Sequence, residues 1–480
     1  MINWFNKILL YTIILLVSNL QLTCSSEIKL KPSNGDDQYQ FGSSVSIFGK
    51  YAIVGAPMSD QNKLEDRGSA YIFEYGDEKW NQQKELLGFN RGDRFGSSVA
   101  ISNNYALIGA PLEDINLSNV GSVYVYVRVE NDWIFQSKMK PNDASIDACF
   151  GSSVSIDDDF AIIGAPNNNI IGSAYIFKRI NNSWIQQEIF TPSDSYELNQ
   201  FSNFGRRVSI SANHSIIGSQ KAAYIFSFDD NKWNEHSKLS LGNTSAVAIS
   251  ETYAIVVKSG RPLAIHDAYI YELKKNIWVK VATINTSNFY GCTYQASINN
   301  NYAIIGKTSD SFNGYISGSA LIYKHIGGSW KKQTTLIASD GSEGDQFGRA
   351  VSISQNHIII SAQYKDDNSI SDVGAVYIYP IDTINPVISG YVRGLNDIPL
   401  SDASISFDKL SSPIKTNAKG YFEKDVCYNW SGRATVSFEN YIFEPDFIAF
   451  STVTNNIQNQ NYKVPTSTIT GFEILSDQVN

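Results

Sequence analysis

A phrase of three segments, FGSSV, AIVGAP and GSAYIF, returns along this chain and constrains its fold more than any other feature. Two degenerate copies keep only the later segments, at residues 253–271 and 302–323. The Phe-Gly pairs that open the complete copies begin at Phe41, Phe95, Phe150, Phe204 and Phe347. We count seven copies, each a unit of about 50 residues that cannot bury its own apolar faces alone.

Each copy reads as four short strands. In the first copy, β-branched and aromatic runs lie at 44–47, at 52–54, at 70–73 and after Trp80, separated by turn-forming residues. Four such strands make one antiparallel sheet, and about four to eight such sheets stack radially to cover their faces. We therefore predict an all-β fold in which residues 25–383 form a seven-bladed β-propeller. An open solenoid is the alternative.

The two ends of the repeat region indicate how the ring closes. The seventh copy ends at 376–379 without a strand that carries a tryptophan. The sequence EIKLKPSNGDDQYQFG, which begins at Glu27, matches QSKMKPNDASIDACFG, the stretch that follows Trp133. We predict that residues 27–31 pair with the last blade, so that no sheet edge is left open. An open solenoid would not need this pairing of the two ends.

The segments FG, GAP and GSAYIF, in this order and number, resemble the FG-GAP repeats of the integrin alpha-subunit head and of many bacterial surface proteins. The resemblance covers residues 26–380 and implies a propeller that recognises ligands on one face, although propellers carry unrelated functions. Integrin-type repeats often hold an aspartate-rich calcium loop between their first two strands. Here that connection is as short as Phe48-Gly49-Lys50, a hairpin turn, so we predict no metal and no cofactor.

Loop lengths distinguish the two faces of the predicted propeller. The first and third turns of each blade lie on one face and are tight, whereas the second turns and the inter-blade loops lie on the other. We call this second face the long-loop face, because it collects segments 58–67, 112–120, 258–266, 307–317 and 364–373 and inter-blade loops 143–147, 193–200 and 340–345. Binding usually resides in loops on a rigid scaffold.

Seven acidic residues are the candidate binding residues of the long-loop face: Asp60, Glu65, Asp66, Glu113, Asp114, Asp366 and Asp367. They would attract cations or basic partners, and solvated loop charge is the alternative. The tripeptide Arg91-Gly92-Asp93 resembles an adhesive motif. Gly344-Asp345 occupies the equivalent place in the seventh copy, so the Gly-Asp part belongs to the repeat itself.

We predict no catalytic residue and no enzyme. His214 and His357 fall where other copies have Tyr or Phe, which indicates a structural role, and the other histidines lack a partner motif. A propeller enzyme whose residues are scattered over several blades would escape this search. No stabilising disulfide is expected among the four cysteines, which are Cys24, Cys149, Cys292 and Cys427.

Both ends of the chain read as separate segments. Residues 1–24 fit a secretory signal peptide, with Lys7 before an apolar run at 8–17. Cys24 is the candidate for lipid attachment. If the segment were not cleaved, it would act as an anchor. Residues 386–464 read as six or seven short strands, a small β-sandwich, and 465–480 form a tail. The motifs ISGYV, PLSDA, NAKGYF and YIFEP resemble carboxypeptidase-regulatory-like or Cna-B-like modules, which usually space or display a neighbouring domain.

Charge narrows the class of partner. The net charge of −9 argues against nucleic acid or an anionic membrane as the ligand. We expect a monomeric, secreted or cell-surface protein that binds an extracellular protein or glycan through the long-loop face, in adhesion or surface assembly. The alternatives are a polysaccharide-acting enzyme, which needs carboxylates converging at the propeller axis, and a structural spacer without a binding surface.

Overall fold

The computed structural model divides the chain into two compact units, one of residues 27–381 and one that contains residues 387–465. Its described residues are 27–34, 38–60, 65–143, 145–194, 202–258, 267–285, 294–367, 370–381, 387–408, 410, 413–426, 430–453 and 457–465. The predicted signal peptide, the tail beyond 465, and loop residues 195–200 and 259–266 lie outside them, as do Cys24, His266, Cys292 and Cys427. No helix in the described part is long and apolar enough to cross a bilayer.

The described residues of the first unit form seven four-stranded antiparallel sheets, which we number one to seven in chain order of their inner strands. From inner to outer strand, they are β2 (Ser44–Phe48), β3 (Tyr51–Ala56), β4 (Ser69–Gly76), β5 (Lys79–Leu87); β6 (Ser98–Ile101), β7 (Tyr105–Ala110), β8 (Ser122–Val129), β9 (Asp132–Met139); β10 (Ser153–Asp157), β11 (Phe160–Ala165), β12 (Ser173–Ile180), β13 (Ser183–Phe190); β14 (Arg207–Ser211), β15 (His214–Gly218), β16 (Ala223–Asp229), β17 (Lys232–Leu239); β18 (Thr244–Ile249), β19 (Tyr253–Lys258), β20 (Asp267–Lys274), β21 (Ile277–Asn285); β22 (Tyr294–Ile298), β23 (Tyr302–Lys307), β24 (Ser319–Ile326), β25 (Ser329–Leu336); and β26 (Val351–Ile353), β27 (His357–Ala362), β28 (Ala375–Pro380), β1 (Ile28–Leu30).

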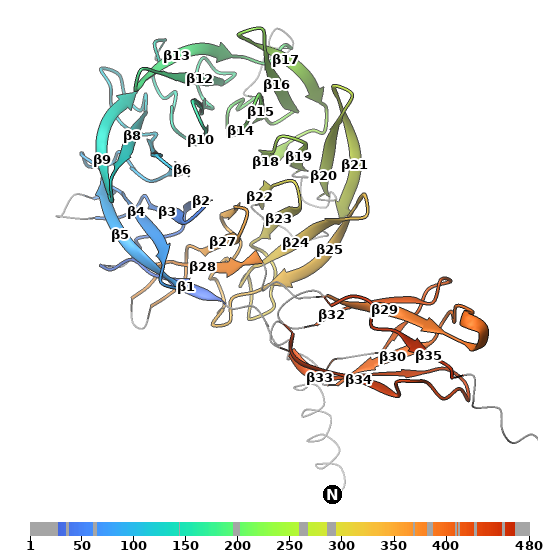
Figure 1. Ribbon diagram of the computed structural model, residues 1–480. Helices are drawn as coiled ribbons and strands as arrows, with labels where there is room; N and C mark the ends of the chain where they lie inside the picture. Colours follow the sequence, from blue (N-terminus) through green and yellow to red (C-terminus); the bar gives the residue numbers. More distant parts are fainter. Residues whose placement is uncertain are drawn as a thin grey trace, which may run out of the picture. The chain divides into compact units, whose positions relative to one another are not determined.

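These sheets are arranged as a ring (Figure 1). Each inner strand contacts the inner strand of the next sheet, from β2 through β6, β10, β14, β18 and β22 to β26, and β26 contacts β2 again. The outer strands, such as β9, β13 and β17, form the rim of the ring. The fold class is therefore all-β and propeller-like.

The two ends of the first unit meet in sheet seven. Strand β1 pairs antiparallel with β28, with Ile28 opposite Ile378 and Leu30 opposite Val376. The Tyr379 hydroxyl donates to Glu27 Oε2 at 2.8 Å, and Lys29 forms an ion pair with Asp340. The first described strand thus supplies the outer strand of the last sheet, where the other sheets have their tryptophan-bearing strand.

The glycines of the repeat lie where adjacent sheets touch through their backbones. A Cβ atom on Gly55, the glycine of the GAP segment in sheet one, would lie 2.0 Å from the carbonyl oxygen of Gly96, the glycine of the FG segment in sheet two. Equivalent contacts join Gly109 to Gly151, Gly164 to Gly205, and Gly306 to Gly348. The repeat needs glycine at these positions because a side chain would separate the sheets.

Aromatic residues fill the rest of each sheet interface. The Trp133 ring of sheet two packs edge-on against the Tyr51 ring of sheet one, with centroids 5.7 Å apart. The same pairing recurs for Trp184 with Tyr105, Trp233 with Phe160, Trp278 with His214, Trp330 with Tyr253, and Trp80 with His357. His214 and His357 therefore occupy the aromatic position of the interface, a structural role.

The second unit contains two sheets in its described residues. From edge to edge they are β32 (Tyr421–Asp425), β29 (Val387–Arg393), β35 (Tyr462–Lys463), and β31 (Ile414–Lys415), β30 (Ser404–Phe407), β33 (Trp430–Ser437), β34 (Phe447–Val453). A short 3-10 helix, η4 (Leu395–Asp397), follows β29. Both sheets contribute to one hydrophobic cluster, with Ile388 and Phe422 from the first sheet and Ile405 and Ala434 from the second. The resemblance to display modules stays a prediction.

Candidate functional site

Hydrogen bonds join several loops of the long-loop face to the inter-sheet segment that follows. Phe95 N donates to Arg67 O at 3.2 Å, and Phe150 N donates to Val120 O at 2.8 Å. The same bond joins Phe347 to Ser317 and Phe41 to Val373. These bonds attach the loop of one sheet to the start of the next inner strand, so the face is a rigid support for exposed side chains.

Three of the predicted binding carboxylates brace their own loops. Asp60 Oδ1 accepts a hydrogen bond from the backbone N–H of Asp66 at 2.8 Å. Asp114 Oδ1 accepts from Asn119 N at 2.9 Å, and Asp366 Oδ1 accepts from Asp372 N at 3.0 Å. Because the three bonds are equivalent in sheets one, two and seven, these aspartates have a structural role whether or not they also bind a partner.

The other four predicted residues form ion pairs: Glu65 with Arg91, Asp66 with Arg94, Glu113 with Lys138, and Asp367 with Lys31. Glu113 is only 6% exposed and also accepts from the hydroxyl of Ser122, so it belongs to the interior of its loop. The seven residues lie in three separate loops, 58–67, 112–120 and 364–373. Within the described part of the chain, no three His, Cys, Asp or Glu side chains are grouped to hold a metal ion.

The Arg91-Gly92-Asp93 tripeptide is built into the face. Asp93 is 5% exposed, and its Oδ2 accepts from Asn90 Nδ2 at 3.0 Å; burial raises the pKa of this carboxyl group above its ordinary value. The equivalent Asp345 is buried and contacts Lys365 Nζ at 3.0 Å. The tripeptide thus follows the repeat, and its carboxylate is out of reach of an external receptor.

Apolar side chains, which the sequence reasoning did not single out, project from the long-loop face. Ile146, between β9 and β10, is 60% exposed, and Ile170, between β11 and β12, is 59% exposed. Both line an open hollow of about 560 Å³ together with Ser145, Asp147, Asn167 and Asn169. Phe312 and Tyr315 are exposed on the loop between β23 and β24. A single exposed apolar residue is ordinary, whereas Ile146 and Ile170 lie together in one hollow.

A central channel of about 510 Å³ runs between the inner strands. Residues from all seven inner strands line it, and Met58, Gln363 and Tyr364 line it from the loops of the long-loop face. Its described lining contains no Asp or Glu, so the converging carboxylates required by the enzyme hypothesis are not among these residues. The lining does contain three arginines, Arg94, Arg207 and Arg349.

Serine hydroxyl groups join neighbouring inner strands around the channel. Ser46 Oγ accepts from the backbone N–H of Ile101 in the next sheet at 3.2 Å. Four further bonds follow the same pattern: Ser155 with Ile210, Ser209 with Ile249, Ser297 with Ile353, and Ser352 with Ile47. The other two sheets have Ala100 and Ala248 at this position. Each serine supplies an acceptor to an edge-strand N–H group that has no partner within its own sheet.

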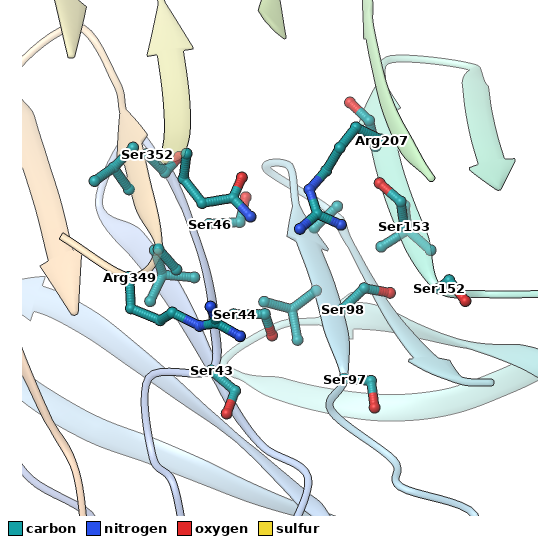
Figure 2. A pocket seen from close by; sticks show the side chains of 18 of the residues that line it. Ser43, Ser44, Ser46, Ser97, Ser98, Ser152, Ser153, Arg207, Arg349 and Ser352 are labelled. Atoms are coloured by element: carbon teal, nitrogen blue, oxygen red, sulfur yellow. The ribbon is translucent and has the colours of Figure 1, made fainter. Parts of the chain in front are cut away.

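The channel arginines depart from the repeat. Two serines follow the Phe-Gly pair in copies one to three, whereas Arg206 and Arg207 follow it in copy four and Arg349 in copy seven. Figure 2 shows Arg207 and Arg349 reaching from two sides of the channel toward the same space. The sequence reasoning missed them, although aligning the copies on Phe-Gly exposes the substitution.

The surroundings of Arg207 are unusual for a guanidinium group. Its Nη1 donates to the carbonyl oxygen of Arg206 at 3.0 Å. With the Gln295 amide oriented so that its oxygen faces the arginine, Nε and Nη2 donate to that oxygen at 3.2 Å. No ion pair joins Arg207 to a carboxylate of the described residues. Burial, and then the charges of Arg206 and Arg349, lower the pKa of Arg207 to about 10, so it remains charged at neutral pH.

Comparison with known protein families matches this chain to the FG-GAP repeat at four ranges, residues 24–73, 80–126, 133–177 and 330–379. The second match begins at the outer strand β5 and ends in β8. The first match begins before β1 and ends in β4, so β1 takes the place that an outer strand has in the second. Residues 178–329 are unmatched, yet their described part folds into sheets of the same kind. No curated protein matches the chain.

Proposed function

The first unit of this chain carries FG-GAP repeats, and from this premise we propose that the protein is a secreted or cell-surface binding protein. It recognises an extracellular macromolecule through the long-loop face and acts in adhesion or surface assembly, without catalysing a reaction. FG-GAP repeats occur in extracellular proteins, often in proteins of adhesion or recognition. Secretion would follow from the signal peptide predicted at residues 1–24.

The observation that carries this proposal is the hollow beside Ile146 and Ile170. Both side chains expose more than half of their surface on loops whose backbones are fixed by the ring. A rigid support lowers the conformational entropy lost on binding, and aliphatic side chains on it can be desolvated by a partner. Aliphatic anchors favour a protein over a glycan as the partner. The acidic residues around the rim would contribute orientation and association rate.

The experiment is a binding screen of the secreted full-length protein against a panel of extracellular proteins and glycans, followed by a comparison of two variants. The test variant carries Ile146→Ser and Ile170→Ser. The control carries Ile185→Ser and Ile189→Ser, which removes two exposed isoleucines from the outer strand β13 of the same sheet. We expect the test variant to weaken a detected interaction about tenfold or more, and the control to leave it unchanged.

Thermal melts of both variants establish that they are folded. Equal affinity of the test variant and the unmodified protein for every detected partner would move recognition away from the Ile146 hollow. If only the control variant lost binding, the partner would bind the outer strand β13. That result would contradict the long-loop face as the recognition surface.

A further inference from the structure

The face opposite the long-loop face, which we call the tight-turn face, carries the hairpin turns between the first and second strands of the sheets. A hollow of about 310 Å³ lies among three of these turns, those of sheets one, two and three. Its lining shares no residue with the Ile146 hollow, which belongs to loops of the other face. Aromatic and polar side chains line it: Phe48, Asn103, Asn104, Asp158, Asp159 and Arg179.

Phe48 departs from the repeat at the residue before the turn. The other six copies have serine, aspartate or asparagine there, at Ser102, Asp157, Ser211, Ser250, Asn299 and Ser354. In four of them the side-chain oxygen accepts a hydrogen bond from the backbone N–H that follows the turn, as Ser102 Oγ does from Tyr105 N at 3.2 Å. Phe48 cannot accept that bond, and its side chain is 43% exposed. The turn of sheet one therefore lacks a stabilising contact and has an aromatic ring beside the hollow instead.

Arginines of the third strands hold the two polar turns. In sheet two, Arg128 Nε donates to the carbonyl oxygen of Asn103 at 2.9 Å, and Arg128 N donates to the carbonyl oxygen of Asn104 at 2.8 Å. In sheet three, Arg179 forms an ion pair with Asp159, and its backbone N–H donates to the Asp159 carbonyl oxygen at 2.7 Å. A ligand would therefore meet turns that are already ordered, which reduces the entropy lost on binding.

Two polar side chains of these turns are available to a ligand. Among the described residues, no hydrogen bond or ion pair engages the Asn103 amide or the Asp158 carboxylate, and both residues are exposed. Asn103 also lies beside the turn of sheet one, because a Cβ atom on Gly49 would be 3.9 Å from its Oδ1. The amide donates and accepts hydrogen bonds, and the carboxylate accepts them. The hollow thus combines an exposed aromatic ring with hydrogen-bonding groups of both kinds.

We propose that this hollow binds a neutral saccharide, with one sugar ring against Phe48 and its hydroxyl groups hydrogen-bonded to Asn103 and Asp158. The C–H face of a sugar ring is apolar and packs on an aromatic ring, while its hydroxyl groups both donate and accept. The lining has three aspartates and one arginine, so it disfavours sulfated, phosphorylated or uronic acid sugars.

The size of the hollow favours the end of a glycan. A volume of about 310 Å³ is at the lower end of the range for small-ligand sites, and it is too small for the flank of a protein. The site lies on different loops from the Ile146 hollow and stands on different observations. Either proposal can therefore fail without the other.

An array of glycans tests the site with the full-length protein. The probes are neutral glycans that end in glucose, galactose, mannose or N-acetylglucosamine, and matched glycans that end in sialic acid or carry sulfate. The variants are Phe48→Ser, which introduces the residue found in four other copies, Phe48→Tyr, Asp158→Ala and Asn103→Ala. Asn300→Ala is the matched control for Asn103→Ala, because it is the equivalent exposed residue of sheet six and does not line the hollow.

We expect the unmodified protein to retain neutral glycans and none of the anionic ones. Titration with the corresponding free oligosaccharide should show that Phe48→Ser weakens binding about tenfold or more, and Asn103→Ala and Asp158→Ala about fivefold. Phe48→Tyr keeps the ring and Asn300→Ala is remote, so both should change the affinity less than about twofold.

A second readout separates ligand binding from a structural role. Without ligand, Phe48→Ser should leave the melting temperature unchanged or raise it, because serine can form the turn bond seen in the other copies. The free oligosaccharide should raise the melting temperature of the unmodified protein and not that of Phe48→Ser.

The proposal is overturned if no neutral glycan is retained, or if Phe48→Ser binds the retained glycan as tightly as the unmodified protein does. Retention of anionic glycans alone would also contradict it. Binding that is lost with Ile146→Ser and Ile170→Ser, and unchanged in Phe48→Ser, would move glycan recognition to the long-loop face.

Discussion

The wall of the central channel and the long-loop face are built in opposite ways. The wall repeats the same contacts, with glycine against glycine at four interfaces and a serine hydroxyl against the next strand at five. In four of the sheets the long-loop face places a different buried residue at one equivalent position, three residues after the last residue of the second strand. In sheets one, two, three and seven that residue is Ser59, Glu113, Asn168 and Lys365.

Three of these four buried residues find a side-chain partner of their own. Glu113 pairs with Lys138, Asn168 Nδ2 donates to Tyr175 Oη at 2.9 Å, and Lys365 pairs with Asp345. Variation is therefore expected in the loops, because the partner of the buried residue differs from one loop to the next. The wall follows the repeat more closely, and arginine replaces serine there at Arg207 and Arg349.

The largest effect should come from the channel wall. In Gly164→Ala, the new Cβ would lie 1.8 Å from the carbonyl oxygen of Gly205, and two backbones would have to separate. We expect a loss of about 3 kcal/mol or more in the free energy of unfolding, measured by chemical denaturation. Gly76→Ala is the control, because its Cβ meets nothing within 4 Å and should change stability by less than about 0.5 kcal/mol. Equal stability of the two variants would refute the role assigned to the repeat glycines.

A buried brace of the long-loop face should come next. Glu113→Ala removes the partner of Lys138, whose side chain is 23% exposed, and the acceptor of the Ser122 hydroxyl. We expect a loss of about 2 kcal/mol, less than for a fully buried pair because solvent reaches the lysine. Glu113→Gln, which keeps an acceptor oxygen, should lose less. If Glu113→Ala melted at the same temperature as the unmodified protein, Glu113 would not stabilise its loop, and this prediction would be wrong.

Exposed braces should have a smaller effect. Asp366→Ala removes one hydrogen bond to the backbone of Asp372 and should cost about 1 kcal/mol. Asp366→Asn keeps the acceptor oxygen and removes the charge, so its stability should match that of the unmodified protein. A partner whose affinity falls in the Asn variant, at unchanged stability, would restore the direct binding role predicted from the sequence for this residue.

The smallest effect should be a dependence of stability on pH. It should come from the charged loop residues, because the glycine and serine contacts of the wall do not titrate. Burial alone would raise the pKa of Asp340, but hydrogen bonds from Lys29 and Tyr377 and the charges of Lys29 and Lys365 lower it below its ordinary value. Its stabilising contribution is thus present above the ordinary pKa of about 3.9 and is lost as the pH falls through the lower folded-state value.

Thermal melts between pH 7 and pH 3 of the unmodified protein and of Asp340→Asn measure this contribution. The difference in melting temperature between the two should be largest near neutral pH and shrink at the acid end. The effect should be small, since the Asp340 side chain is 44% exposed. A difference that grows on acidification would contradict the assigned contacts of this carboxylate.

Much of the ring was predictable from the sequence, because the same contacts recur in each copy. Spacing of the Phe-Gly pairs predicted the strands, and the match between the segments after Glu27 and after Trp133 predicted the strand that pairs with β28. The acidic residues were harder. In the sequence, Asp60 and Asp366 look like free charges on loops. Each accepts a hydrogen bond from a backbone N–H group, and residue type does not reveal where the backbone places that group.

The sequence by itself determined the unit and its interfaces, since glycine and tryptophan at fixed intervals permit one way of stacking the sheets. Only the tertiary structure decided what the ring encloses. Arg207 and Arg349 lie 142 residues apart in the chain, and nothing in the sequence connects them. They share one channel because seven inner strands converge on a single axis, and the field of a charge depends on distance in space rather than on position in the sequence.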